Sequence, residues 1–125
     1  MKKIIFTDKA PAPIGPYNQA VLAGNTLYTS GQIALNPSTM ELVLDTIEIE
    51  TSQVMNNMKA VLEAADMDFS NVVKSTIFIA DMNDFSKINT VYASYFDEKT
   101  APARETVQVA KLPRNVNIEI SMIAI

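Results

Sequence analysis

The last quarter of the chain alternates apolar and polar residues with a period of two, which is the pattern of β-strands rather than helices. The alternation covers residues 104–109 and 116–123, and a proline-containing stretch at 111–115 separates the two segments. Arg104 and Glu119 thus stand on rigid elements within largely apolar, strand-forming surroundings. Any fold of this chain has to place these two charged side chains on one face or the other of a sheet.

The rest of the chain predicts further strands and two amphipathic helices, in which apolar residues recur at three- and four-residue spacing. The strands are expected at residues 4–6, 18–22, 26–30 and 72–80, and the helices at 47–65 and 84–96. Asp84 is the expected cap of the second helix, with Asp81 and Asn83 as competitors. The order strands, helix, strand, helix, strands predicts an α+β sandwich, with a mixed sheet and two helices on one face.

Two helices can cover only one side of such a sheet, yet the strands carry apolar residues on both sides. Ile77 and Ile79 point away from Phe78, and near the C-terminus Ile123 points away from Met122. A second face that is partly apolar has to be buried against something, most simply another copy of the chain. We therefore expect a homo-oligomer with the sheet faces inside.

Composition limits the classes of function. The 125 residues, 48% of them hydrophobic, fit one domain over 1–125, and a net charge of -4 argues against non-specific nucleic-acid binding. The absence of cysteine and histidine excludes zinc enzymes of the usual kinds, cysteine hydrolases and serine–histidine triads. No apolar run approaches the ~20 residues of a membrane span, and the N-terminal run is too short for a secretory signal. A cytoplasmic protein is expected.

Arg104 is the strongest candidate for ligand binding. A guanidinium on a rigid strand forms two parallel, charge-assisted hydrogen bonds with a carboxylate, which predicts a small carboxylate ligand. The alternative is a plain salt bridge with Glu119 or Glu105. Alternation places Thr106 on the same face as Arg104, and if the two C-terminal strands pair, Arg104 and Glu119 reach one cavity.

Other candidates lie in the N-terminal half and on the second helix. Tyr17 follows the proline-rich loop at residues 10–16, and either donates its hydroxyl to a ligand or closes the loop as a partly buried aromatic. Ser30 and Gly31 offer backbone groups to a ligand or form a bulge. Asn89 bonds a neighbouring loop or is solvated. The methionines are expected to fill the core.

Several separated motifs resemble those of one family. They are Ala-Pro-Ile-Gly-Pro-Tyr-Asn-Gln-Ala at 12–20, Thr-Ser-Gly-Gln-Ile at 29–33, Val-Lys-Ser-Thr-Ile-Phe at 73–78, Asp-Met-Asn-Asp-Phe at 81–85, the segment 92–96, Ala-Pro-Ala-Arg at 101–104, Leu-Pro at 112–113 and Ile-Glu-Ile at 118–120. Together they resemble the reactive intermediate deaminase (RidA/YjgF) family of enamine/imine deaminases over essentially the whole chain. The resemblance implies a chorismate-mutase-like two-layer sandwich, assembled as a trimer around a β-barrel-like core with three sites between subunits.

The implied activity is hydrolytic deamination of 2-aminoacrylate and 2-aminocrotonate, through their imines, to 2-keto acids and ammonia. Such enamines are released by pyridoxal-phosphate-dependent dehydratases, so the implied role is damage control in amino-acid metabolism. The reaction needs no cofactor.

The resemblance also implies roles for individual residues. Arg104 matches the arginine that clamps the substrate carboxylate, and Glu119 the carboxylate that positions or activates water. The cleft-lining positions are matched by Tyr17, Ser30, Gly31 and Asn89. Thr106 stands where many members carry cysteine, and Glu105 where a small residue is common; alternation turns Glu105 away from the site.

Two other functions compete. A non-catalytic regulator would use the same arginine cleft to bind 2-keto acids or other small metabolites and signal through a protein partner. A ribonuclease or translation inhibitor, an activity attached to some family members, fits the acidic balance and the lack of histidine less well.

Overall fold

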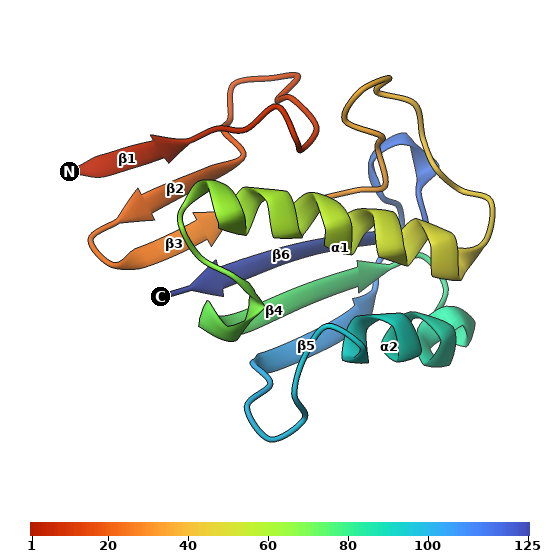
Figure 1. Cartoon of the computed structure of the whole chain (residues 1–125). Coiled ribbons are helices and arrows are strands. Elements are labelled where there is room, and N and C mark those ends of the chain that lie inside the picture. The colour runs from red at the N-terminus through yellow and green to blue at the C-terminus, as the bar shows by residue number, and fades with distance from the viewer.

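One mixed β-sheet of six strands forms the body of the protein, with two helices on one of its faces (Figure 1). The computed structural model describes residues 1–125. The strands are β1 (Lys2–Ile5), β2 (Ala20–Ala23), β3 (Thr26–Thr29), β4 (Val72–Ile79), β5 (Ala103–Gln108) and β6 (Ile118–Ala124), and the helices are α1 (Ile47–Ala64) and α2 (Phe85–Ala93). Short 3₁₀ turns are η1 (Phe69–Asn71), η2 (Met82–Asp84) and η3 (Pro113–Asn115). The predicted α+β class is confirmed.

The strand order in the sheet is β1-β2-β3-β6-β4-β5. All neighbours are antiparallel except β4 and β5, which run parallel and are connected through α2. The last strand of the chain is thus inserted between β3 and β4, in the middle of the sheet. The two C-terminal strands do not pair, because β4 lies between β5 and β6.

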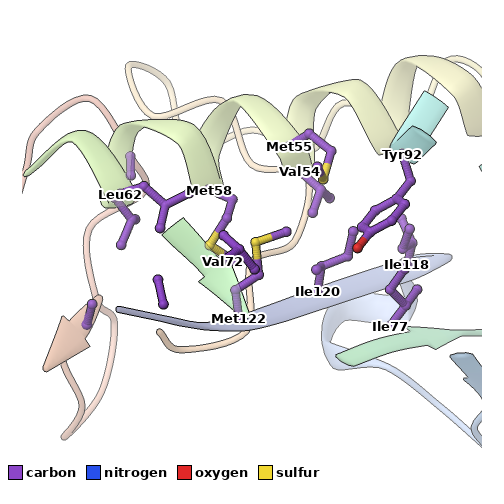
Figure 2. Close-up of a cluster of buried hydrophobic side chains, with 14 of the residues drawn as sticks. Val54, Met55, Met58, Leu62, Val72, Ile77, Tyr92, Ile118, Ile120 and Met122 are labelled. Atoms are coloured by element: carbon purple, nitrogen blue, oxygen red, sulfur yellow. The ribbon is translucent and has the colours of Figure 1, made fainter. Parts of the chain in front are cut away.

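The core lies between α1 and the helix-facing side of the central strands. Met55 and Met58 of α1 pack above Ile77 of β4 and Ile120 and Met122 of β6 (Figure 2). Burial of each such side chain contributes roughly 1.5–3 kcal/mol relative to leaving it exposed. The expectation that methionines fill the core is confirmed for these residues, all of them at most 2% exposed.

The opposite face of the sheet has no helix over it. It carries Phe78 of β4 and Ile123 of β6, and Tyr28 of β3 lies directly beside Ile123. Tyr28 is half exposed, and so is Val107 of β5. This face is partly apolar, as alternation predicts, and the homo-oligomer inferred from it stays a prediction.

The start of α2 differs from the expected one. Asp84 makes no side-chain capping bond, because its own backbone is helical (φ -85°, ψ -3°) rather than extended as a capping residue requires. Asp81 instead accepts a hydrogen bond from the Asn83 backbone N–H and caps η2, which leads directly into α2. Neither helix of the protein has the combination of length and apolarity that a membrane crossing requires.

Candidate functional site

The predicted site residues form two clusters on opposite faces of the sheet. Arg104 pairs in register with Ser75, whose buried side chain faces the helices, so the arginine lies on the helix side. Glu119 pairs with Phe78 and lies on the uncovered side. The shared cavity expected for Arg104 and Glu119 if their strands pair is therefore not formed within a single chain.

Arg104 is held on a platform that α2 presents. Its Nη1 donates to the Asn89 side-chain oxygen at 2.6 Å, and its guanidinium carbon lies 5.1 Å from the Tyr92 ring centroid and 5.7 Å from that of Phe85. Phe85, Asn89 and Tyr92 are spaced four and three residues apart, which places them on one stripe of the helix. Cation–π contacts of this kind contribute about 0.5–2 kcal/mol each.

The rest of the Arg104 guanidinium is free. The bond to Asn89 occupies one of its five donors. No ion pair involves Arg104: the structure contains one salt bridge, in which Lys74 Nζ lies 2.9 Å from the Glu105 carboxylate. Since Thr76, which pairs with Glu105, lies on the uncovered face, Glu105 points away from Arg104 as predicted. The plain salt bridge weighed as an alternative does not form.

A buried hydrogen bond fixes the Tyr92 ring under Arg104. The Tyr92 hydroxyl donates to Ser75 Oγ at 2.9 Å, and both side chains are buried. Burial raises the pKa of Tyr92, only partly offset by this hydrogen bond and by the charge of Arg104, so the phenol stays neutral and keeps its proton for the bond. Phe85 and Tyr92 were not predicted as site residues, although their spacing of four and three residues from Asn89 indicates that they share its side of the helix.

Thr106 completes the helix-side cluster, which we call the arginine cluster: Phe85, Asn89, Tyr92, Arg104 and Thr106. Thr106 Oγ1 is the one buried side-chain oxygen or nitrogen atom without a hydrogen-bond partner. A buried unpaired hydroxyl is unfavourable unless a ligand or an ordered water bonds it. The arginine cluster therefore offers a free guanidinium edge and a free hydroxyl on the same strand face.

The second cluster lines a cavity of about 450 Å³ on the Glu119 side, which we call the glutamate pocket. Its 13 lining residues are Pro11, Ala12, Ile14, Tyr17, Gln19, Ser30, Gly31, Gln32, Ile33, Leu35, Pro113, Arg114 and Glu119. Four predicted site residues are thus brought together, while Arg104, Asn89 and Thr106 are not among them. Burial raises the pKa of Glu119, with no hydrogen bond or charge offsetting the effect, as expected for a carboxylate able to accept a proton.

Gly31 lies directly against the Glu119 side chain. A Cβ atom at Gly31 would lie 2.7 Å from Glu119 Cδ and 2.8 Å from its Oε2, closer than real Cβ contacts. The approach is fixed by a two-way backbone bridge, in which Gln32 N–H donates to the Ile120 carbonyl at 2.7 Å and Ile120 N–H donates back at 3.1 Å. The glycine is therefore needed because Glu119, rather than a ligand, takes the space of its side chain.

Two buried amides hold the walls of the glutamate pocket, and no sequence pattern predicted them. Gln19 Nε2 donates to the carbonyls of Ala10 and Pro11 at 3.2 and 3.0 Å and so fixes the proline loop. Asn57 of α1 donates to the carbonyls of Ile33 and Leu35 at 3.1 and 2.9 Å. The pocket is thus preformed by bonds from the core.

Tyr17 and Ser30 have different positions in the pocket wall. Tyr17 is 48% exposed, so half of its side chain is covered, and its hydroxyl makes no hydrogen bond. The Ser30 hydroxyl donates to the Asn18 carbonyl, which ties the strand end to the loop that carries Tyr17. Ser30 therefore supports the wall, while the Tyr17 phenol is available at the rim.

Comparisons with known proteins find relatives over nearly the whole chain. Residues 7–125 match the family model described as Endoribonuclease L-PSP. A RutC family protein of Synechocystis is 52% identical over 98% of this chain and 95% of its own length. The mouse 2-iminobutanoate/2-iminopropanoate deaminase is 48% identical over 100% of this chain and 92% of its own length. The crystal structure of Escherichia coli TdcF with bound serine superposes with a TM-score of 0.92, at 45% identity over 98% of both chains.

Proposed function

The chain belongs to the Endoribonuclease L-PSP family, which is the RidA/YjgF family that its motifs resemble, and we propose that it hydrolyses reactive 2-imino acids to 2-keto acids and ammonia. The substrates are 2-iminopropanoate and 2-iminobutanoate, with their enamine tautomers 2-aminoacrylate and 2-aminocrotonate. The single observation that carries the proposal is Arg104, a strand-borne guanidinium held by Asn89 and two aromatic rings with no carboxylate partner of its own.

Substrate binding follows from the arginine cluster. The free edge of the Arg104 guanidinium takes the substrate carboxylate through two parallel hydrogen bonds. The unpaired Thr106 hydroxyl donates a further bond to the same group or to a bound water. The carboxylate is adjacent to the C=N carbon, so holding it also orients the reacting atom.

Glu119 performs the proton transfer. Its carboxylate accepts a proton from water as the oxygen attacks the C=N carbon, and the nitrogen takes up a proton to give a carbinolamine. The hydroxyl proton of the carbinolamine is then transferred to the nitrogen through Glu119, the C–N bond breaks, and ammonia and the 2-keto acid are released. Tyr17 at the rim donates its phenolic hydrogen to the ligand. Because such imines also hydrolyse unaided in water, positioning of water and substrate is sufficient chemistry for this site.

The complete site is assembled between copies of the chain. Arg104 and Glu119 lie on opposite faces of one sheet, so the arginine cluster of one copy has to face the glutamate pocket of another. The uncovered, partly apolar sheet face supplies the surface for association. We propose a cytoplasmic homotrimer with three such sites. Sedimentation of the purified protein tests the subunit number.

The activity is tested by adding purified protein to a threonine or serine dehydratase reaction and measuring the release of ammonia and 2-keto acid. We expect the wild type to accelerate this release and Arg104→Ala to have no effect on it. The Arg104 side chain is exposed, so its removal should leave the fold intact. Full activity of Arg104→Ala would refute the assignment of the site.

The competing functions give different results in the same set of proteins. Glu119→Gln retains ligand binding and loses turnover if the protein is an enzyme. A metabolite-binding regulator, for which the serine complex of TdcF is the relevant precedent of ligand binding, shows no turnover in either form. If the protein is a ribonuclease, RNA-degrading activity stays with the protein through purification and is lost in the Arg104 variants.

A further inference from the structure

The glutamate pocket contains a second cation that the proposed reaction does not use. Arg114 and Glu119 are the two charged residues among the 13 that line the cavity. Arg114 takes part in no ion pair, and the one side-chain hydrogen bond donated by an arginine belongs to Arg104. The guanidinium of Arg114 is therefore unpaired at the wall of a pocket that also contains the proposed proton acceptor.

The backbone holds Arg114 in a conformation that arginine seldom adopts. Its φ and ψ are 54° and 24°, in the left-handed region that suits glycine or asparagine. The loop is anchored on both sides by Leu112 and Val116, which are 5% and 1% exposed, and backbone bonds from Asn115 to Leu112 and from Val116 to Pro113 close it. Such outliers persist where the surroundings fix them, and they occur frequently at ligand sites.

We infer that Arg114 binds a second acidic group on the substrate, so that the site also accepts 2-imino acids with a carboxylate-bearing side chain. The inference rests on the proposed function, in which Arg104 of another copy takes the carboxylate next to the imine. An acidic side chain entering this pocket would be repelled by the ionised Glu119, so it needs a cation of its own at the pocket wall. Arg114 supplies the cation in a form that binds a carboxylate in a bidentate manner.

The part of the pocket that one chain forms has room for a substrate longer than three or four carbon atoms. Its volume of about 450 Å³ lies within the range of roughly 300–1,000 Å³ found for pockets that hold drug-sized ligands. Ile14, Ile33 and Pro113 supply apolar walls for the carbon chain. The dicarboxylic imine made by oxidation of aspartate is the probe of this class.

The test compares two imines made in the reaction mixture by D-amino-acid oxidase from D-alanine and by D-aspartate oxidase from D-aspartate. Semicarbazide is added to trap the free imine, and hydrolysis by the protein is measured as the decrease in the rate of trapping. Arg114→Asn is the variant of choice, because asparagine removes the charge and tolerates the left-handed backbone. Lys111→Asn is the matched control, an exposed cation of the same loop that does not line the pocket.

We expect Arg114→Asn to lower kcat/KM for the dicarboxylic imine on the order of 10- to 100-fold, because a hydrogen-bonded charge pair is lost. For the alanine-derived imine, kcat/KM should change less than about twofold. Lys111→Asn changes neither, and Arg114→Lys recovers part of the loss. Three results would overturn the inference and leave the proposed function standing. They are equal effects of Arg114→Asn on both imines, no acceleration of dicarboxylic imine hydrolysis by the wild type, and a subunit number of Arg114→Asn that differs from that of the wild type in sedimentation. Failure of the wild type on both imines would refute the proposed function itself.

Discussion

A single added methyl group at Gly31 tests whether the position of the Glu119 carboxylate controls the reaction. The new Cβ atom in Gly31→Ala would lie 2.7 Å from Glu119 Cδ, whereas ordinary contacts begin at 3.4 Å. A retreat of the carboxyl group by 3.4 − 2.7 = 0.7 Å restores an ordinary contact. Glu119 Cγ would lie 2.9 Å away as well, so the whole side chain has to turn, but all the atoms in conflict belong to this one side chain and none to the backbone.

The expected effect falls on activity rather than on stability. Misplacement of a catalytic group by about 1 Å costs on the order of 100-fold in rate, so a shift of this size lowers kcat/KM roughly 10- to 100-fold. In free energy, this is a loss of about 1.4–2.7 kcal/mol in stabilisation of the transition state. The melting temperature changes by a few degrees at most, because the clash is relieved by rotation of one side chain.

Gly15→Ala is the matched control for this measurement. Gly15 lies in the loop that carries Tyr17, and a methyl group added there would meet no atom nearer than 3.6 Å, an ordinary contact. Both variants are assayed with 2-iminopropanoate, and thermal unfolding of each is recorded. Wild-type kcat/KM in Gly31→Ala, or an equal loss in Gly15→Ala, would contradict the view that the close approach of Gly31 fixes the carboxylate.

Further predictions concern Glu119 and the platform under Arg104. Since burial raises the pKa of Glu119 and the base has to be ionised, kcat/KM should fall as the pH drops through that raised pKa; a profile flat across the acidic range contradicts this. A raised native-state pKa stabilises the fold in acid, and this contribution is lost as pH rises, so Glu119→Gln should melt above the wild type at neutral pH, with the gap closing in acid. Tyr92→Leu should raise KM several-fold more than Tyr92→Phe, which keeps the ring under Arg104; equal KM values would show that the ring has no positioning role. Arg104→Lys should retain little activity, because lysine cannot form two parallel bonds with a carboxylate; wild-type kcat/KM would refute the bidentate clamp.

Local sequence pattern assigned each strand residue to a face of its own strand, but it could not order the strands. Alternation placed Thr106 on the same face as Arg104, and the pairing of β5 with β4 agrees. The neighbour of each strand depends on pairing between distant segments, and the insertion of β6 beside β4 has no local signal. A shared cavity for Arg104 and Glu119 was therefore conceivable only as long as their strands were taken as neighbours; with β4 between them, the two side chains lie on opposite faces of the sheet.

The supporting residues of the site differ in how far sequence reveals them. Tyr92 was predicted in the second helix, and its spacing from Asn89 would have placed it under Arg104 once the helix faced β5. Gln19 and Asn57 carried no such signal, because a buried amide is recognised only by the carbonyl groups that it meets in the folded chain. Gln19 lies within the motif at 12–20, which did not reveal its role, and Asn57 lies in none of the motifs.

The most direct test of a site shared between copies is complementation between two inactive variants. Arg104→Ala and Glu119→Gln are unfolded together in equal amounts, refolded, and assayed for ammonia release from 2-iminopropanoate. Each site draws its arginine and its glutamate from different copies, so random mixing restores both residues in about one quarter of the sites, and we predict about a quarter of wild-type activity. Activity no higher than that of the separate variants, in a mixture shown to contain both chains in one oligomer, would contradict the shared site.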